Sequence, residues 1–249
     1  MDTTILLLAG MIGLVSGVAS GFFGIGGGAI RIPLLNLLGF TLIAAYGMNL
    51  IALPVSSFMG AMSQKQNIDM HLGRYMILGG ALGTVIGTLI AFNFAESALL
   101  LALIFLLVSI VSVIAMNLHN IAPRVSEEFS PSFNNLFSGT LVFNTLTGMR
   151  GGSEGSLFVP LQRLLNVEMH KAIATALFAA IFTSIVGVLL YWGHGHLLLI
   201  PGIVVLVGST IGSRIGSRFS LETKSKWLEV GLTILILVLA GVPLLEIQM

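Results

Sequence analysis

Two glycine-rich segments contain the residue types that could bind a small anion. The first is formed by Gly24, Ile25, Gly26, Gly27 and Gly28, and Arg31 follows it. The second is formed by Arg150, Gly151, Gly152, Ser153 and Glu154. Glycines expose backbone N–H groups, and the positive end of a helix beside a guanidinium attracts negative charge. We therefore predict an anion-binding site at these segments, although a tight turn or close helix packing would also explain the glycines.

The charged residues at these segments have more than one explanation. Arg31 is flanked by Ile30 and Ile32 and has no acidic neighbour in the sequence. A charge inside a membrane usually marks a transport pathway, but an arginine can also extend to the lipid headgroups. Arg150 and Glu154 could form a structural ion pair, or Glu154 could carry a proton. Burial raises a carboxyl pKa and a nearby arginine lowers it, so the sequence leaves this choice open.

Polar side chains within apolar segments are further candidates for substrate contact. They are Asn49, Ser56, Ser57, Thr175, Thr183 and Ser184. Serine and threonine in membrane helices also bond their own backbone or a neighbouring helix, and that alternative stays open. His194 and His196 follow Trp192 and are typical of anchors at the membrane interface, with a proton relay as the alternative.

The amino-acid composition is typical of a membrane protein. Of 249 residues, 56% are hydrophobic and 8% are charged, and the mean hydropathy is +1.03, whereas a soluble domain carries roughly 25% charged residues. The net charge of +1 argues against a nucleic-acid partner. The absence of cysteine excludes disulfides and thiolate chemistry. The histidines form no HExxH pair, and we expect no metal, no cofactor and no convergent catalytic set.

The hydrophobic segments predict an all-α polytopic membrane protein. Eight of them are long enough to cross a bilayer, near residues 4–23, 42–62, 74–94, 97–117, 136–150, 171–192, 197–216 and 227–246. Two shorter segments, 29–38 and 156–165, follow the glycine-rich segments and could each reach only about 15 Å as a helix. They are interpreted as half-helices. No Lys or Arg precedes the first segment, so we interpret it as a helix rather than a signal peptide.

The chain divides into two similar halves, 1–117 and 136–249, joined by a polar loop at 118–135. The segment Gly24–Leu34 resembles Gly151–Leu161 at an offset of 127, and other matches are Ala45 with Ala172, Ser57 with Ser184 and Gly60 with Gly187. The glycine ladders Gly79/Gly83/Gly87 and Gly208/Gly212/Gly216 are predicted helix-packing faces. We expect two four-helix repeats, parallel or inverted. Interrupted helices at matching places in two repeats point to a transporter's binding site.

The motifs resemble those of the TauE/SafE sulfite exporter family. Gly-Ile-Gly-Gly-Gly with the following Pro33-Leu34 is similar to the family's first signature. The segment from Ala45 to Ser57, its partner from Ala172 to Gly187, and Gln66-Asn67-Ile68-Asp69 are similar to later family segments. The resemblance covers most of the chain. This chain departs from the family at Gly152–Gly155 and at Met48-Asn49, where a substrate is expected.

The resemblance implies a secondary exporter of sulfite, an organosulfonate or a related small anion across the cytoplasmic (inner) membrane, without ATP. The expected partners are a small anionic substrate and the lipid bilayer, while proton coupling and a homodimer are left open. The alternatives are an anion channel that uses the same glycine segments as a filter, and a transporter of a non-sulfur organic anion.

Simple alternation of eight spans predicts the sidedness of the loops. It assigns the connections at 24–41, 95–96, 151–170 and 217–226 to one side of the membrane, where most of the Lys and Arg residues lie. The cations on the opposite side are Lys65, Arg74 and Arg124. The positive-inside rule then assigns the first set to the cytoplasm and both termini to the outside.

Overall fold

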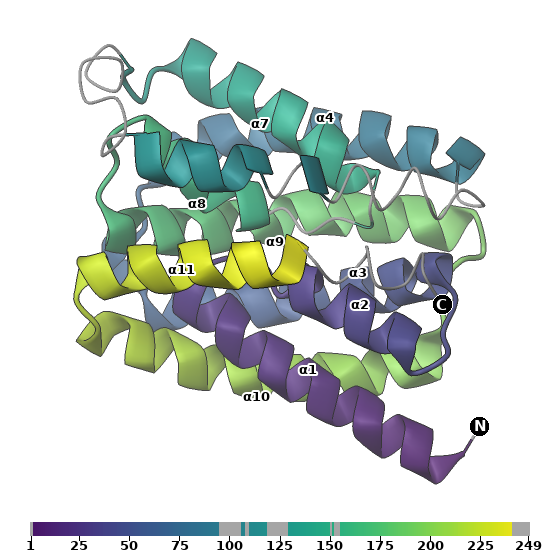
Figure 1. Cartoon of the computed structure of the whole chain (residues 1–249). Coiled ribbons are helices and arrows are strands. Elements are labelled where there is room, and N and C mark those ends of the chain that lie inside the picture. The colour runs from purple at the N-terminus through teal and green to yellow at the C-terminus, as the bar shows by residue number, and fades with distance from the viewer. Residues whose placement is uncertain are drawn as a thin grey trace.

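The structure is a computed structural model that describes residues 2–94, 106–107, 110–118, 129–149, 151 and 155–240. Its helices are α1 (Thr3–Phe23), α2 (Gly28–Leu37), α3 (Leu42–Ser63), the 3-10 turn η1 (Lys65–Asn67), α4 (Met70–Phe94), α7 (Phe133–Gly148), α8 (Gly155–Leu164), α9 (Met169–Gly193), α10 (Leu199–Glu222) and α11 (Ser225–Ala240). Residues 110–118 are also helical, and the described ranges contain no β-strand. In Figure 1, α9 runs through the middle, with α4 and α7 above it and α1 and α10 below it.

Five helices, α1, α3, α4, α9 and α10, are long and apolar enough to cross a membrane. The chain is therefore a multi-pass, all-helical membrane protein. Helices α7 and α11 each have 16 described residues, and most of the span predicted at 97–117 lies outside the described residues. The half-helices predicted at 29–38 and 156–165 are observed as α2 and α8, each with 10 residues.

Two helix boundaries differ from the expectation for physical reasons. Helix α4 begins at Met70 rather than near 74, because the Asp69 carboxylate accepts hydrogen bonds from the amides of His71 (3.0 Å) and Leu72 (3.1 Å). A carboxylate at this position stabilises the first turn of a helix. Helix α10 continues to Glu222 rather than ending near 216, because a helix can extend into the interface beyond its apolar run.

Helices α1, α3 and α10 run in the same direction. Along α1, Gly13, Gly17 and Gly21 lie against Val205, Ser209 and Ser213 of α10 in turn; along α3, Gly47 and Gly60 lie against His196 and Ser213. Helices α4, α7 and α9 run in the opposite direction. Gly79, Gly83 and Gly87 of α4 lie against Phe137, Leu141 and Thr145 of α7, and Gly73 and Gly80 lie against Phe178 and Thr183 of α9.

The shared direction of α1 and α3 corrects the predicted sidedness of the loops. Alternation assumed that residues 24–41 connect two spans on one side. Instead α2 is a half-helix that returns the chain toward the end where α1 begins, so α3 starts at that same end. The turn at 64–69 therefore lies at the other end of the bundle, with the ends of α1 and α10. There the Gln64 side chain donates to the carbonyl of Gly21 (3.1 Å).

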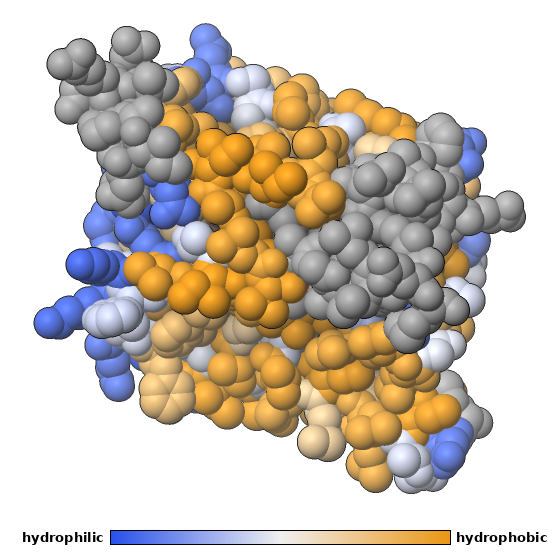
Figure 2. Space-filling view, viewed as in Figure 1, coloured by the Kyte–Doolittle hydropathy of each residue, from blue (hydrophilic) through white to orange (hydrophobic). Residues whose placement is uncertain are grey.

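This correction gathers the positive charge at one end of the bundle, which we name the cationic end. Lys65 and Arg74, which alternation assigned to the opposite side, lie at the same end as the other cations. The described Lys and Arg residues of the cationic end are Lys65, Arg74, Arg163, Lys171, Arg214, Arg218, Lys224 and Lys226. Figure 2 shows hydrophilic residues along the left edge of the molecule, which is this end, and a broad apolar surface beside them.

The predicted glycine ladders pack helices closely. A Cβ at Gly83 would collide with the carbonyl oxygen of Leu141, and one at Gly212 would collide with that of Leu14. Small residues let helix backbones approach and gain van der Waals contact in a membrane, where no hydrophobic effect favours helix association. The ladders therefore make α1–α10 and α4–α7 the two closely packed parallel pairs.

Residues 127 positions apart make reciprocal contacts in the centre of the molecule. Gly60 of α3 lies against Leu177 of α9, while Gly187 of α9 lies against Leu50 of α3. The two glycine-rich segments behave in the same way: Gly24 lies against Ile173, while Gly151 lies against Tyr46. Both Gly24 (φ 72°) and Gly151 (φ 80°) have left-handed backbone, which favours glycine.

Candidate functional site

Arg31 is the fourth residue of α2, and its side chain is fully buried. Its Nε donates to the Ser16 hydroxyl (3.1 Å), and Nη1 donates to the Oδ1 atom of Asn49 (2.7 Å) and to the Asn49 carbonyl (3.4 Å). Nη2 is buried and has no hydrogen-bond partner within the described part of the chain. The guanidinium is therefore held at Nε and Nη1, while the N–H groups of Nη2 have no acceptor within the described ranges.

Gly27 makes room for this guanidinium. It caps the N-terminus of α2 in a left-handed conformation (φ 75°) and supplies no side chain to the first amides of the helix. A Cβ on Gly27 would lie 2.9 Å from Nη2 of Arg31 and 2.8 Å from the carbonyl oxygen of Ser16. Any other residue would thus fill the space beside Nη2 of Arg31. Gly27 and Arg31 therefore lie next to each other, and their contact with a substrate stays a prediction.

Asn49 connects Arg31 to the second glycine-rich segment. Its Oδ1 accepts from Arg31, and its Nδ2 donates to the carbonyl of Gly151 at 2.9 Å. Gly151 in turn lies against the ring of Tyr46, one turn before Asn49 on α3. A single amide side chain therefore joins the two segments, which are more than 100 residues apart in the sequence.

The electrostatics at Arg31 favour an anion. No carboxylate contacts Arg31 among the residues that the structure describes; the ion pairs there join Arg163 with Glu229 and Lys171 with Asp69. Burying a charge without a counter-charge costs several kcal/mol, about 3–5 by analogy with broken buried pairs. A bound anion would offset this cost.

Two serines of α1 belong to this site, and sequence reasoning missed them. Ser16 accepts from Arg31. The Cβ atom of Ser20 lies beside Gly27, and its buried hydroxyl has no hydrogen-bond partner among the described residues. The signal available in the sequence was their spacing of four, which places both hydroxyls on the face of α1 that leads into the first glycine segment.

The other predicted hydroxyls do not join Arg31. Ser56, Thr183 and Ser184 donate to carbonyls of their own helices, those of Leu53, Ala179 and Ala180. Thr175 accepts from the amide of Asp69 (3.0 Å), in the turn between α3 and α4. Ser57 is buried, and its hydroxyl has no hydrogen-bond partner within the described ranges.

The second glycine segment is described only at Gly151 and from Gly155 onward. Arg150, Gly152, Ser153 and Glu154 lie outside the described residues, so the predicted convergence of Arg150 with Arg31 stays a prediction. Residues 151–155 match the pattern G-x-S-x-G, which marks a nucleophile only between a strand and a helix; here the preceding element is helix α7. Phe158 is the position in the second half that corresponds to Arg31, 127 residues later. It is a buried apolar residue, so the second half has no arginine at this position.

A neutral polar cluster joins α4 and α7. The Nδ2 atom of Asn144 donates to the carbonyl of Gly80 (2.9 Å) and to Thr84 (3.0 Å), and Thr147 donates to Oδ1 of Asn144 (3.2 Å). Sequence reasoning missed this cluster because nothing distinguishes it from other polar residues in α7. The polar groups of this cluster are hydrogen-bonded to one another, so we assign the cluster to holding α4 and α7 together.

The predicted interface anchors lie at the end of the bundle opposite the cationic end. The ring of His194 packs against that of Phe92 in a tilted arrangement with centroids 4.2 Å apart, and its Nδ1 lies 2.8 Å from the carbonyl of Leu190. Trp192 is largely exposed. These contacts link the ends of α4 and α9.

Comparison with known proteins identifies the family. The profile of the sulfite exporter TauE/SafE family matches residues 9–242. A probable membrane transporter protein of Bacillus subtilis (strain 168), YunE, is 21% identical over 94% of this chain and 95% of its own length. Another from the same organism, YdhB, is 27% identical over 82% of this chain and 86% of its own length. A probable membrane transporter protein of Xylella fastidiosa (strain 9a5c) is 33% identical over 40% of this chain and 39% of its own length. Because the family profile spans nearly the whole sequence, this protein belongs to the TauE/SafE sulfite exporter family of membrane transporters.

Proposed function

We propose that the protein is a secondary transporter that exports a small oxyanion, sulfite or an organosulfonate, across the cytoplasmic membrane. The observation that carries this proposal is the buried guanidinium of Arg31, whose Nη2 atom has no hydrogen-bond partner among the described residues. The description of the matching family as a sulfite exporter supports the choice of sulfur oxyanions.

The donor geometry around Arg31 suits an anion with several oxygens. Nη2 of Arg31 and the side chain of Ser20 both lie beside Gly27, and neither Nη2 nor the Ser20 hydroxyl has a hydrogen-bond partner among the described residues. The amino-terminal amides of α2 begin at Gly28 and carry the positive end of the helix dipole. An SO₃ group presents three oxygens, so one could accept from the guanidinium while the others accept from the hydroxyl and the amides. A charge-assisted bond of this kind contributes about 1.5–3 kcal/mol.

We further propose eight spans arranged as an inverted repeat, residues 1–117 and 136–249 joined by 118–135. The opposite directions of α1 and α7 support inversion, as do the reciprocal contacts of Gly60 with Leu177 and of Leu50 with Gly187. In such transporters the substrate lies near the midplane between the repeats, at interrupted helices. The bond of Asn49 to Gly151 lies between the two halves, so a movement of one half against the other would change it.

Arg31 and Asn49 give a route from anion binding to this movement. Oδ1 of Asn49 accepts a hydrogen bond from Nη1 of Arg31. A bound anion competes for the same guanidinium and weakens that bond, and the same side chain holds Gly151. We propose that loading the site thereby loosens the contact between the halves. Proton coupling through Glu154 and assembly as a homodimer stay predictions.

Transport by reconstituted protein tests the proposal. Proteoliposomes loaded with sulfite, taurine or isethionate should release the anion faster than control liposomes without protein. Arg31→Gln should abolish the difference. Carboxylates such as acetate form the comparison panel, and faster release of these than of the sulfur oxyanions would favour the non-sulfur alternative. A single-channel conductance independent of any proton gradient would favour an anion channel. Equal release from all liposomes would contradict transport of these anions altogether.

A further inference from the structure

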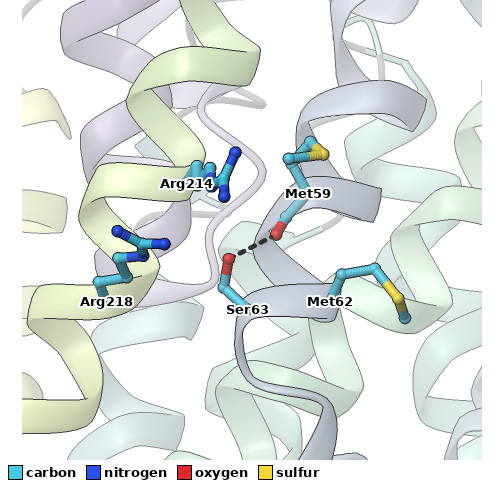
Figure 3. A pocket seen from close by; sticks show the side chains of 5 residues that line it. All are labelled: Met59, Met62, Ser63, Arg214 and Arg218. Carbon is cyan, nitrogen blue, oxygen red and sulfur yellow. Dashed lines mark hydrogen bonds between the residues drawn. The ribbon is translucent and has the colours of Figure 1, made fainter.

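A cavity of about 360 Å³ lies between α3 and α10 near the cationic end, away from Arg31. It is lined by Met59, Met62, Ser63, Arg214 and Arg218. Figure 3 shows both guanidinium groups on α10 beside the residues of α3. The Ser63 hydroxyl donates to the carbonyl of Met59 at 2.9 Å, so the donors free to bind an anion in this cavity are those of the arginines.

The two arginines lack counter-charges. Arg214 and Arg218 are four positions apart on one face of α10, where like charges destabilise a helix. Neither forms an ion pair with any described residue, and Glu222, one turn beyond Arg218, does not pair with it. Lys65, Lys224 and Lys226 add positive charge at the same end of the bundle. A bound anion would relieve this repulsion.

The surface next to the cavity indicates where that anion comes from. Along α10 an exposed apolar stripe of Ile203, Val207 and Ile211 leads directly to Arg214. Along α3 the exposed side chains Val55, Phe58 and Met62 lead to the same cavity. Apolar side chains of this size on the outside of a membrane helix face acyl chains. The arginines therefore lie at the depth where those chains meet their headgroups.

We propose that this cavity binds the phosphate of an anionic phospholipid, with its acyl chains along the stripes of α3 and α10. Guanidinium groups form paired hydrogen bonds with phosphate oxygens, and a monoanionic headgroup without its own ammonium supplies the missing charge. Zwitterionic lipids carry a compensating cation and gain less from two arginines. The site is independent of the Arg31 site and of the proposed transport substrate.

Native mass spectrometry of the full-length, delipidated protein tests this proposal. Phosphatidylglycerol should bind about 25-fold more tightly than phosphatidylcholine, since each of the two arginines contributes on the order of a fivefold preference for anionic lipid. Arg214→Gln/Arg218→Gln should remove this preference. The matched control is Lys224→Gln/Lys226→Gln, which removes the same charge at the same end outside the cavity and should keep the preference. The single variant Arg218→Gln gives an intermediate result if the double variant does not fold.

Two outcomes would overturn the proposal. One is an equal preference for phosphatidylglycerol in the arginine pair variant and the lysine control, because the cavity would then add nothing beyond general surface charge. The other is saturation of the site by millimolar inorganic phosphate, measured as a thermal shift that the arginine variant loses. That result would assign the cavity to a soluble anion rather than to a lipid.

Discussion

The guanidinium of Arg31 and the side-chain amide of Asn49 form a buried hydrogen-bonded pair between α2 and α3, with Nη1 2.7 Å from Oδ1. The same amide donates to the carbonyl of Gly151. An amide can accept from a cation on one side and donate to a carbonyl on the other, which a carboxylate cannot do. The pair therefore positions the cation without neutralising it, and leaves its charge for a ligand.

Removal of the guanidinium should weaken anion binding. Arg31→Gln should lower the affinity for sulfite by roughly ten- to a hundredfold, the equivalent of one charge-assisted bond of about 1.5–3 kcal/mol. Arg31→Lys should restore little, because an ammonium keeps the charge but not the planar fork. Isothermal titration calorimetry provides the measurement. Lys65→Gln, which removes an exposed cation, serves as the control.

The sequence predicts the same behaviour for Arg150→Gln and Arg150→Lys. Unchanged affinity in all four arginine variants would assign these residues to packing or to headgroup anchoring. The anion would then have to bind through backbone amides and hydroxyls alone.

Replacement of Asn49 by an apolar side chain of similar size should destabilise the fold. Asn49→Leu removes the side-chain bonds to Arg31 and to Gly151, and leaves the buried guanidinium with the Ser16 hydroxyl and the more distant backbone carbonyl of residue 49 (3.4 Å). We expect a loss of about 2–4 kcal/mol, the sum of one charge-assisted and one neutral hydrogen bond. Unfolding in SDS titrations measures it. Asn93→Leu is the same substitution at an exposed site and should cost little, since Asn93 bonds Leu89 of its own helix and no other residue within the described ranges. Equal losses in both variants would contradict the role of Asn49.

The sequence predicted the broken helices well because their signals are local. Glycine runs, a proline and an apolar length too short to span are all visible in residues 24–38 and 151–165, and α2 and α8 begin within one residue of the expected positions. Arg31 stood out for the same reason, as a charge between two isoleucines. The directions of α1 and α3 were predicted wrongly because alternation counts every connection as a crossing, whereas α2 returns to the end from which α1 started.

Contacts between the halves were beyond sequence reasoning. The bond from Asn49 to Gly151 joins residues brought together only by the fold. Ser16 was missed because it lies among Gly13, Gly17 and Gly21, where a small residue suggests packing. Thr175 was predicted to contact the substrate because it is polar in an apolar helix. Its hydroxyl instead accepts a hydrogen bond from the backbone amide of Asp69, a partner that the sequence does not reveal.

The glycine ladders predict a large effect of a single methyl group. In Gly212→Ala the new Cβ would overlap the carbonyl oxygen of Leu14, so α1 and α10 must separate. Overpacking of this kind costs about 1–3 kcal/mol and should lower the melting temperature in detergent. Gly193→Ala is the control, because its Cβ would have no neighbour within 4 Å. A melting temperature for Gly212→Ala equal to that of the control would show that the helices adjust without loss.

Acid should destabilise the cationic end. Burial raises the pKa of the Asp69 carboxyl, but the Leu72 amide and Lys171 outweigh this and hold the pKa below its ordinary value of 3.8. Burial likewise raises the pKa of Glu168, and the amides of His170 and Lys171 lower it below 4.5. A depressed carboxyl pKa stabilises the fold above the unfolded value and loses this effect as the pH falls through the folded value.

The melting temperature should therefore be nearly constant above about pH 5 and decline as the pH falls below about 4.5. Asp69→Asn/Glu168→Gln should reduce that decline, whereas Glu222→Gln, at an exposed carboxylate without an ion pair among the described residues, should not. A decline of the same size in the double variant would assign the acid sensitivity to other groups.

The gathering of cations at one end predicts the orientation in the membrane. Because the positive-inside rule assigns Lys- and Arg-rich loops to the cytoplasm, the cationic end should be cytoplasmic, and the end at which α1 begins should face outward. The sequence contains no cysteine, so a single introduced thiol reports its own position. In right-side-out membrane vesicles, a membrane-impermeant maleimide should label Gly193→Cys, at the exposed last residue of α9, and should label Lys224→Cys only after the vesicles are opened. Both sites are exposed, so the contrast reports the side of the membrane rather than burial. The reverse labelling pattern would invert the orientation and place the α3–α10 cavity in the outer leaflet of the membrane.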